Sequence, residues 1–366
     1  MSILLALLFV ASVLISFFNP VQAADSATVS VTNSKVVMNF PTSLTFSAQI
    51  KSSATITDVR LRYQVDQTSI ATVTAENFVT ITPSSNINAS YQLDMRRFGG
   101  FPPGTNLHYW WAVKSGGSKF QESDAQSFSI ADNRYTWKNL TQGFISISWY
   151  SGDSKFGQAL MDTAQTSLIK LAKDTGASPN KTINIFIYAN STDLQGSLIY
   201  PNEWTGGVSF FQYNVIAIGI STSNLTWGES AMTHELTHNV VGQLVYNPYS
   251  DLPVWLNEGL AMYSQGPLTT QFTGPLSQAI KNQALISVRT IASPFSANGD
   301  KANLSYAESY SLVDYLQKTY GPDKMQALLK VFSQGSTYDN AFKQVYGFDM
   351  DGLNAKWQPW VSQNYK

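Results

Sequence analysis

Residues 232–241 read MTHELTHNVV and contain two of the three histidines in a chain of 366 residues. These histidines, His234 and His238, lie four positions apart, and Glu235 directly follows the first. In a helix, positions four apart share one face about one turn from each other, so both imidazoles could reach one metal ion. Three apolar residues would lie toward the opposite face and anchor the helix in a core: Met232, Leu236 and Val240.

Capping signals predict where the helices around this motif begin and end. Thr226 is expected to be the N-cap of the histidine helix, with Glu229 reaching back in a capping box. A second helix is expected to open at Pro253 and to close at Gly266. Gly259, inside that second helix, would allow another element to approach closely.

A catalytic zinc site usually has three protein ligands and one open position for water. The chain has no cysteine, so the third ligand must be a carboxylate or the remaining histidine, His108. Glu258 lies in the apolar sequence WLNEGLAM, where an isolated carboxylate is costly unless it is paired or bound to a metal. We therefore predict one zinc ion per chain on His234, His238 and Glu258, and an ordinary surface role for His108.

Glu235 is available for catalysis. Its neighbour His234 would bind the ion, while the carboxylate of Glu235 can face the water that the ion binds. We predict that it is the general base that activates water for attack on a peptide or protein substrate. A second donor is needed for the developing oxyanion. Tyr306 and Tyr310, in NLSYAESYSLVDYL, are the candidates.

The segment HELTH, followed after nineteen residues by Glu258 in WLNEG, resembles the gluzincin zinc metallopeptidases. WLNEG is similar to the sequence around the third zinc ligand of the zinc aminopeptidases in that group. From about Arg134 onward the chain resembles the peptidase MA-like family of smaller bacterial peptidases. This resemblance implies a mixed sheet followed by helices, and it favours Tyr306 over Tyr310 as the transition-state donor.

Two features depart from the relatives' patterns. The chain has no Gly-x-Met-Glu-Asn sequence, which the aminopeptidases use to hold the substrate amine. This absence weakens the exopeptidase interpretation and favours an endopeptidase or an enzyme of narrower specificity, although the sequence does not decide between them. Met262 stands where thermolysin-like enzymes have an aspartate that orients the first histidine, so the partner of His234 is undetermined by the sequence.

The rest of the chain predicts an α+β protein with two domains. Apolar and polar residues alternate along 44–50, 59–65 and 107–113, with turn residues between, which is typical of antiparallel strands. We expect an Ig-like or fibronectin-like β-sandwich over residues 25–131, and part of it, from 101 onward, also resembles the β-domain that often precedes such peptidases. Residues 132–366 would form the catalytic domain, where Gly206 to Gly219 could supply an edge strand that binds peptide by β-addition.

Residues 1–24 predict a signal peptide, because a short apolar run over 3–18 precedes a small-residue cleavage site. The expected location is therefore the medium or the cell surface, and an uncleaved membrane anchor is the alternative. The β-domain could associate with the cell wall. The net charge of -1 gives no indication of a nucleic-acid partner.

Two other functions compete with a peptidase. A surface binding or adhesion protein could use the same residues as a structural metal site, although such a site would have no need of Glu235. A glycosidase requires only two carboxylates, so the sequence leaves that class open as well.

Overall fold

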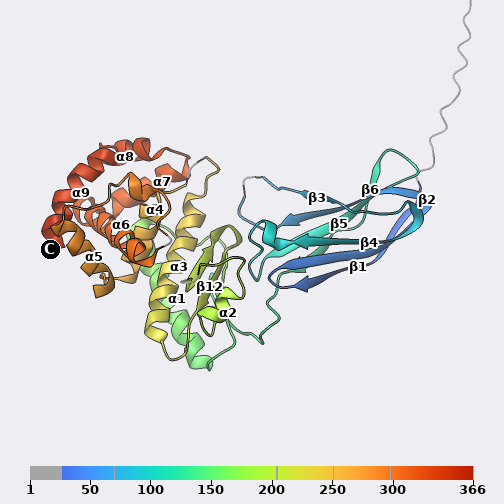
Figure 1. Cartoon of the computed structure of the whole chain (residues 1–366), viewed down its shortest axis with the longest axis horizontal. Coiled ribbons are helices and arrows are strands. Elements are labelled where there is room, and N and C mark those ends of the chain that lie inside the picture. Colours follow the sequence, from blue (N-terminus) through green and yellow to red (C-terminus); the bar gives the residue numbers. More distant parts are fainter. Residues whose placement is uncertain (1–26, 70, 203–204, 250, 297, 366) are drawn as a thin grey trace, which may run out of the picture.

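The computed structural model describes residues 27–69, 71–202, 205–249, 251–296 and 298–365. The predicted signal peptide lies outside the described residues. A β-domain lies beside a second domain that contains a smaller sheet and the helices (Figure 1). The predicted α+β class is confirmed, because the antiparallel strands come first and the mixed sheet and helices follow. Within the described residues, no helix is both long enough and apolar enough to cross a membrane.

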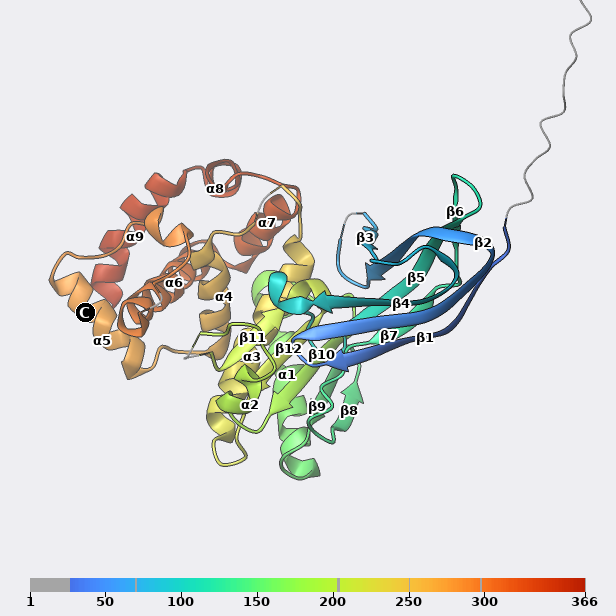
Figure 2. The same ribbon diagram turned by 45° about the vertical axis from the view of Figure 1, so that its right-hand side comes forward.

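The β-domain is one antiparallel sheet organised around a single long strand. Its elements are β1 (Val29–Asn39), β2 (Ser43–Val65), β3 (Ala75–Phe78), β4 (Ser84–Asp94), η1 (Met95–Arg97), β5 (Asn106–Ser115), β6 (Phe120–Glu122) and β7 (Gln126–Ser129). The first half of β2 pairs with β1 and β4, and its second half pairs with β3 and β5. Because β2 belongs to both halves, the sheet curls around one core (Figure 2).

The two predicted runs at 44–50 and 59–65 are parts of this one strand. Along β2 the buried apolar residues fall on even numbers up to Ile56 and on odd numbers from Val59. The pairing register of β2 shifts between Ile56 and Asp58, which moves the inward-facing positions by one residue. Phe46 from the first half then meets Tyr109 of β5 at 5.0 Å between ring centroids.

The second domain is built on a mixed sheet of five strands. These are β8 (Lys138–Gln142), β9 (Ile145–Trp149), β10 (Ile183–Tyr188), β11 (Gly207–Phe210) and β12 (Val215–Gly219), in the spatial order β11-β12-β10-β9-β8. The three inner strands are parallel, and β8 and β11 are antiparallel edge strands. The edge strand expected between Gly206 and Gly219 is therefore present as β11.

Helices cover the sheet and form the rest of this domain (Figures 1 and 2). They are α1 (Ser154–Thr175), α2 (Ser191–Gln195), η2 (Phe211–Tyr213), α3 (Leu225–Val245), α4 (Val254–Gln265), α5 (Thr270–Lys281), η3 (Thr290–Ala292), α6 (Gly299–Tyr320), α7 (Pro322–Ser333), α8 (Tyr338–Tyr346) and α9 (Met350–Asn364). Isoleucines of β9, β10 and β12 share one core with apolar residues of α1, α3 and α4. This packing fixes α3 against the sheet.

The two domains contact each other beside η2. The Thr68 amide donates to the Gln212 carbonyl at 2.6 Å, and the ring of Phe101 lies 6.2 Å from that of Tyr213. Tyr213 packs against the core of the β-domain. The β-domain therefore supports the segment that directly follows the edge strand β11.

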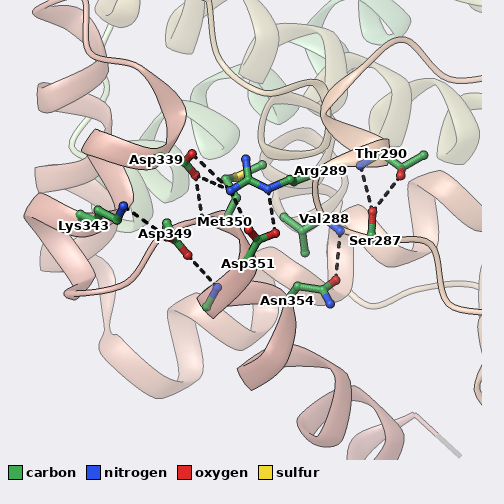
Figure 3. A network of polar contacts seen from close by, with 11 residues as sticks. Ser287, Val288, Arg289, Thr290, Asp339, Lys343, Asp349, Met350, Asp351 and Asn354 are labelled. Atoms are coloured by element: carbon green, nitrogen blue, oxygen red, sulfur yellow. Dashed lines mark hydrogen bonds and ion pairs between the residues drawn. The ribbon is translucent and has the colours of Figure 1, made fainter.

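A polar network fastens the segment between α5 and α6 to the C-terminal helices (Figure 3). Arg289 pairs with Asp339 at 3.1 Å and with Asp351 at 2.7 Å. The amide of Val288 donates to Asn354 Oδ1 at 3.1 Å. Arg289 reaches both carboxylate oxygens of Asp351, so this bidentate pair and the hydrogen bond from the Val288 amide together hold the segment.

Candidate active site

The histidine motif lies on α3, and the predicted helix is present with a different start. α3 begins at Leu225, with Asn224 at the N-cap position and no side-chain cap hydrogen bond. The capping box predicted for Thr226 and Glu229 is wrong, because Thr226 already lies in the first helical turn. The helix is held from behind instead, by its fully buried residues Met232, Leu236 and Val240.

Helix α4 has the predicted ends, with Pro253 at the N-cap and Gly266 at the C-cap position. It packs closely against α6, as expected from Gly259. A Cβ atom added to Gly259 would lie 2.4 Å from the Ser309 carbonyl oxygen and 2.7 Å from Val313. Only glycine fits between the two helices here, and this contact fixes the neighbouring Glu258.

The side chains of His234, His238 and Glu258 converge between α3 and α4. The two imidazole Nε2 atoms are 3.0 Å apart, and Glu258 Oε2 lies 3.4 Å from each of them. All three side chains are largely buried, with exposed fractions of 14–20%. The structure therefore brings together the three predicted ligands, and this group could hold a metal ion.

Two amides on α4 determine how the imidazoles present their lone pairs. His234 Nδ1 lies 3.2 Å from Gln265 Oε1, and His238 Nδ1 lies 3.1 Å from Asn257 Oδ1. Gln265 is itself fixed, because its Nε2 donates to Ser230 Oγ at 2.8 Å. With each Nδ1–H donated to an amide oxygen, each Nε2 carries a lone pair directed at the shared centre.

Three lone-pair donors at such short distances require a cation or shared protons between them. Among the described residues, Glu258 Oε2 is buried without a hydrogen-bond partner. A buried carboxylate oxygen without a partner is costly, and a divalent cation would satisfy it together with both imidazoles. The donor set therefore fits a metal ion.

The electrostatics of the group agree with this conclusion. Burial opposes ionisation of Glu258, but His238 and His234 outweigh that effect and lower its pKa. Burial also opposes protonation of His238, but the charge of Glu258 outweighs it and raises the pKa of His238 to about 9. A carboxylate that keeps its charge here attracts a positive partner, which can be a proton or a metal ion.

Glu235 lies between this group and the edge strand β11. A Cβ atom added to Gly207 would be 2.8 Å from Glu235 Oε1, so the glycine makes room for the carboxylate. Burial raises the pKa of Glu235 and outweighs the nearby charges of His234 and His238, which lower it. A half-buried carboxylate beside a metal-binding group and an open strand edge can exchange a proton with a bound reactant.

The two candidate tyrosines lie in different surroundings. Tyr306, on α6, is half-buried against the ring of Phe295, with centroids 5.1 Å apart. Burial raises its pKa, as do the charges of Glu258 and Glu235, so its hydroxyl is within electrostatic range of both. Tyr310 is instead buried against Tyr263, with centroids 5.9 Å apart, and the charge that raises its pKa belongs to Asp314.

His108 does not belong to this group. It lies on β5 of the β-domain, where its ring nitrogens bond Ser127 Oγ at 3.0 Å and Asp66 Oδ1 at 3.2 Å. Of the two candidates for the third metal ligand, a carboxylate or His108, the structure thus supports the carboxylate of Glu258. Sequence reasoning missed Gln265 and Asn257, because an amide on a helix surface gives no signal of its own.

One protein family and several solved structures are similar to parts of this chain. The sequence model of the Peptidase MA superfamily matches residues 163–363, and no curated protein matches the chain. Among solved structures, an aminopeptidase N family protein from Idiomarina loihiensis is similar over 90% of this chain and 76% of that one, with 13% identity and a TM-score of 0.43. The ApaA protein from Bordetella pertussis matches 30% of this chain and 95% of its own, with 10% identity and a TM-score of 0.21.

Both TM-scores lie below 0.5, so the family assignment depends on the sequence model. That model spans more than half of the chain and includes α3, α4 and α6. The His234, His238 and Glu258 group lies within the matched residues and could bind a metal ion. The chain belongs to the Peptidase MA superfamily.

Proposed function

We propose that the protein is a zinc-dependent peptidase that hydrolyses peptide bonds at the group formed by His234, His238 and Glu258. The observation that carries the proposal is the convergence of two imidazole lone pairs and one carboxylate, 3.0–3.4 Å apart, beside a free carboxylate on Glu235. Zinc ligands at about 2.0–2.1 Å in a tetrahedral arrangement lie about 3.3 Å from one another. These separations suit zinc.

The residues around the ion would divide the reaction between them. When bound, zinc lowers the pKa of water and polarises the scissile carbonyl. Glu235 accepts the proton of the attacking water as the new C–O bond forms. The C–N bond then breaks, and Glu235 returns this proton to the leaving amine, which restores its carboxylate.

Tyr306 would stabilise the carbonyl oxygen while negative charge develops on it. Its hydroxyl remains a donor at neutral pH, because burial and the nearby Glu258 raise its pKa. A hydrogen bond to an oxyanion in a site shielded from water contributes far more than one in solution. Tyr310 has no such part, since it packs away from both carboxylates.

Substrate chain would bind along β11. The far edge of this strand is unpaired within the described sheet, and its first residue, Gly207, contacts Glu235. A peptide that adds to this edge would bring a carbonyl close to both Glu235 and the metal-binding group. This arrangement favours a peptidase over an adhesion protein with a structural metal site.

Export remains part of the proposal, supported by the apolar run over residues 3–18 and the small-residue cleavage site that follows it. The substrate would then be a peptide or protein outside the cytoplasm. Association of the β-domain with the cell wall is a further proposal of the same kind.

The decisive experiment is digestion of a peptide library by the purified protein, with and without a chelator. We expect cleavage that the chelator abolishes and that added zinc restores. Glu235→Gln should reduce kcat by at least about 100-fold while zinc stays bound, because general-base catalysis typically contributes about 10²- to 10⁴-fold. Casein cleavage by this variant at the wild-type rate would disprove the mechanism.

The two tyrosines test the oxyanion assignment. Tyr306→Phe should lower kcat by about 10²-fold with little change in KM, since removal of one oxyanion donor typically costs 10²- to 10³-fold. Tyr310→Phe is the matched control on the same helix and should leave kcat near the wild-type value. Equal effects of the two substitutions on kcat would rule out a specific role for Tyr306.

A further inference from the structure

A cavity of about 570 Å³ opens directly beside the metal-binding group. His238 and Glu258 form part of its wall, and Ser209 of β11 forms another part. Its volume lies within the range of about 300–1,000 Å³ that is usual for ligand pockets. The cavity therefore adjoins the place where, in the function proposed above, the scissile bond would lie.

The walls of this cavity are mainly apolar and defined by close packing. Phe211 lies on Gly242 of α3, where an added Cβ atom would be 2.6 Å from the phenyl ring. The ring of Tyr246 is 6.1 Å from that of Phe211, and Leu252 and Val254 also line the cavity. Such walls suit the aliphatic stem of a long side chain.

One charge in the cavity is left without a counter-charge. Asp251 lines it and is exposed, and no ion pair or hydrogen bond joins its carboxylate to another described residue. No lysine or arginine is found among the described residues that line the cavity. The two positive charges of a bound zinc ion would be offset by the carboxylates of Glu258 and Glu235, so the carboxylate of Asp251 leaves the site with one net negative charge.

We propose that this cavity is a specificity subsite that binds a cationic group of the substrate, with Asp251 as its counter-ion. The group is an alkylammonium or guanidinium, carried by a lysine or arginine next to the scissile bond. The stem lies against Phe211, Leu252 and Val254, and the charged end reaches Asp251. The inference rests on the proposed peptidase function and names the substrate class for that site.

The test uses two N-acetylated peptides that differ only in lysine or norleucine beside the cleaved bond. We expect kcat/KM to be about two- to fivefold higher for the lysine peptide, as an exposed charge pair of up to about 1 kcal/mol gives. Asp251→Asn should remove this preference while cleavage of the norleucine peptide is unchanged. Asp124→Asn, in a loop of the β-domain, is the matched control and should keep the preference.

A third peptide, with a free N-terminal amine and a neutral residue at the same place, identifies the source of the cation. Faster cleavage of this peptide than of its acetylated form, lost in Asp251→Asn, would place the terminal ammonium in the cavity and overturn the side-chain assignment. An equal preference for lysine in wild type and Asp251→Asn would overturn the subsite itself.

Binding separates this inference from the proposed function. Calorimetry with the zinc-loaded Glu235→Gln variant measures affinity for the lysine and norleucine peptides without hydrolysis. Tighter binding of the lysine peptide, lost when Asp251→Asn is added, supports the subsite even where the wild-type protein cleaves neither peptide. Equal affinities contradict the subsite even where chelator-sensitive cleavage confirms the peptidase.

Discussion

Helices α3 and α4 supply the same site in different ways. α3 contributes the two imidazoles and Glu235 from the side that is turned toward α4 and β11, while Met232, Leu236 and Val240 pack in the core on its other side. α4 contributes Glu258 from a helix whose neighbouring side chains, Trp255, Leu256 and Leu260, are fully buried. It also provides Asn257 and Gln265, the acceptors that orient both imidazoles.

This difference separates a chemical role from a positioning role. α3 has a motif whose spacing alone creates a pair of lone-pair donors. α4 fixes the direction of those donors and completes the set, and it can do so only because Gly259 lets it approach α6. We infer that substitution of Glu235 on α3 chiefly changes the rate of the reaction, whereas substitutions on α4 chiefly change metal binding.

Glu258→Ala should have the largest effect on metal binding and is the first test of this contrast. Loss of the only carboxylate in the group should weaken zinc binding by more than about 100-fold, beyond the 10- to 100-fold typical of an outer-shell residue. The measurement is zinc content after dialysis, determined by atomic absorption. Glu235→Gln is the matched control on α3 and should keep one zinc per chain.

The contrast fails if Glu258→Ala also retains one tightly bound zinc per chain. The two imidazoles alone would then hold the ion, and α4 would not be needed to complete the site.

Gly259→Ala should have a smaller but clear effect on folding. The added methyl group would meet the Ser309 carbonyl at 2.4 Å, and backbone cannot move aside as a flexible side chain can. Overpacking of this kind typically costs about 1–3 kcal/mol, so the thermal midpoint should fall. Zinc affinity should fall with it, because α4 must shift away from α6 and Glu258 then leaves its present position relative to His234 and His238.

Gly274→Ala is the matched control for this substitution. Gly274 lies inside α5, and a Cβ atom there meets nothing within 4 Å. Alanine gains helix propensity here, but the ring of Pro275 disfavours a helical conformation at the residue before it, so the midpoint should stay near that of wild type. A midpoint for Gly259→Ala as high as that of Gly274→Ala would show that α4 and α6 are not tightly fitted.

Much of the fold follows from local patterns. The strand at 145–149 and the helix around Leu160 and Leu168 are where the periodicity predicts them. The continuity of β2 was missed, because its register shift near Asp58 reverses the side on which apolar residues fall. A pattern based on alternation breaks at such a shift, although the strand itself continues.

The site, too, has parts that the sequence predicts and parts that it does not. The spacing of His234 and His238 and the apolar setting of Glu258 predict three converging groups, because each signal depends on a few adjacent residues. The partner of His234 was unpredictable, since Gln265 lies 31 positions away and meets it only where α3 crosses α4. The helix start was misplaced because Asn224 and Thr226 are both suitable N-cap residues.

Of the three substitutions on α4, Gln265→Leu should have the smallest effect on zinc binding. It tests most directly whether α4 orients the imidazole of His234. It removes the acceptor of His234 Nδ1 and leaves all three metal-binding groups in place, so zinc affinity should fall by about tenfold. Gln265→Glu keeps an acceptor and adds a charge that makes His234 more basic, so its zinc affinity should equal or exceed that of wild type. Competition with a chromophoric chelator measures both variants. If leucine and glutamate weaken zinc binding equally, the loss comes from the contact of Gln265 with Ser230, and α4 does not orient His234.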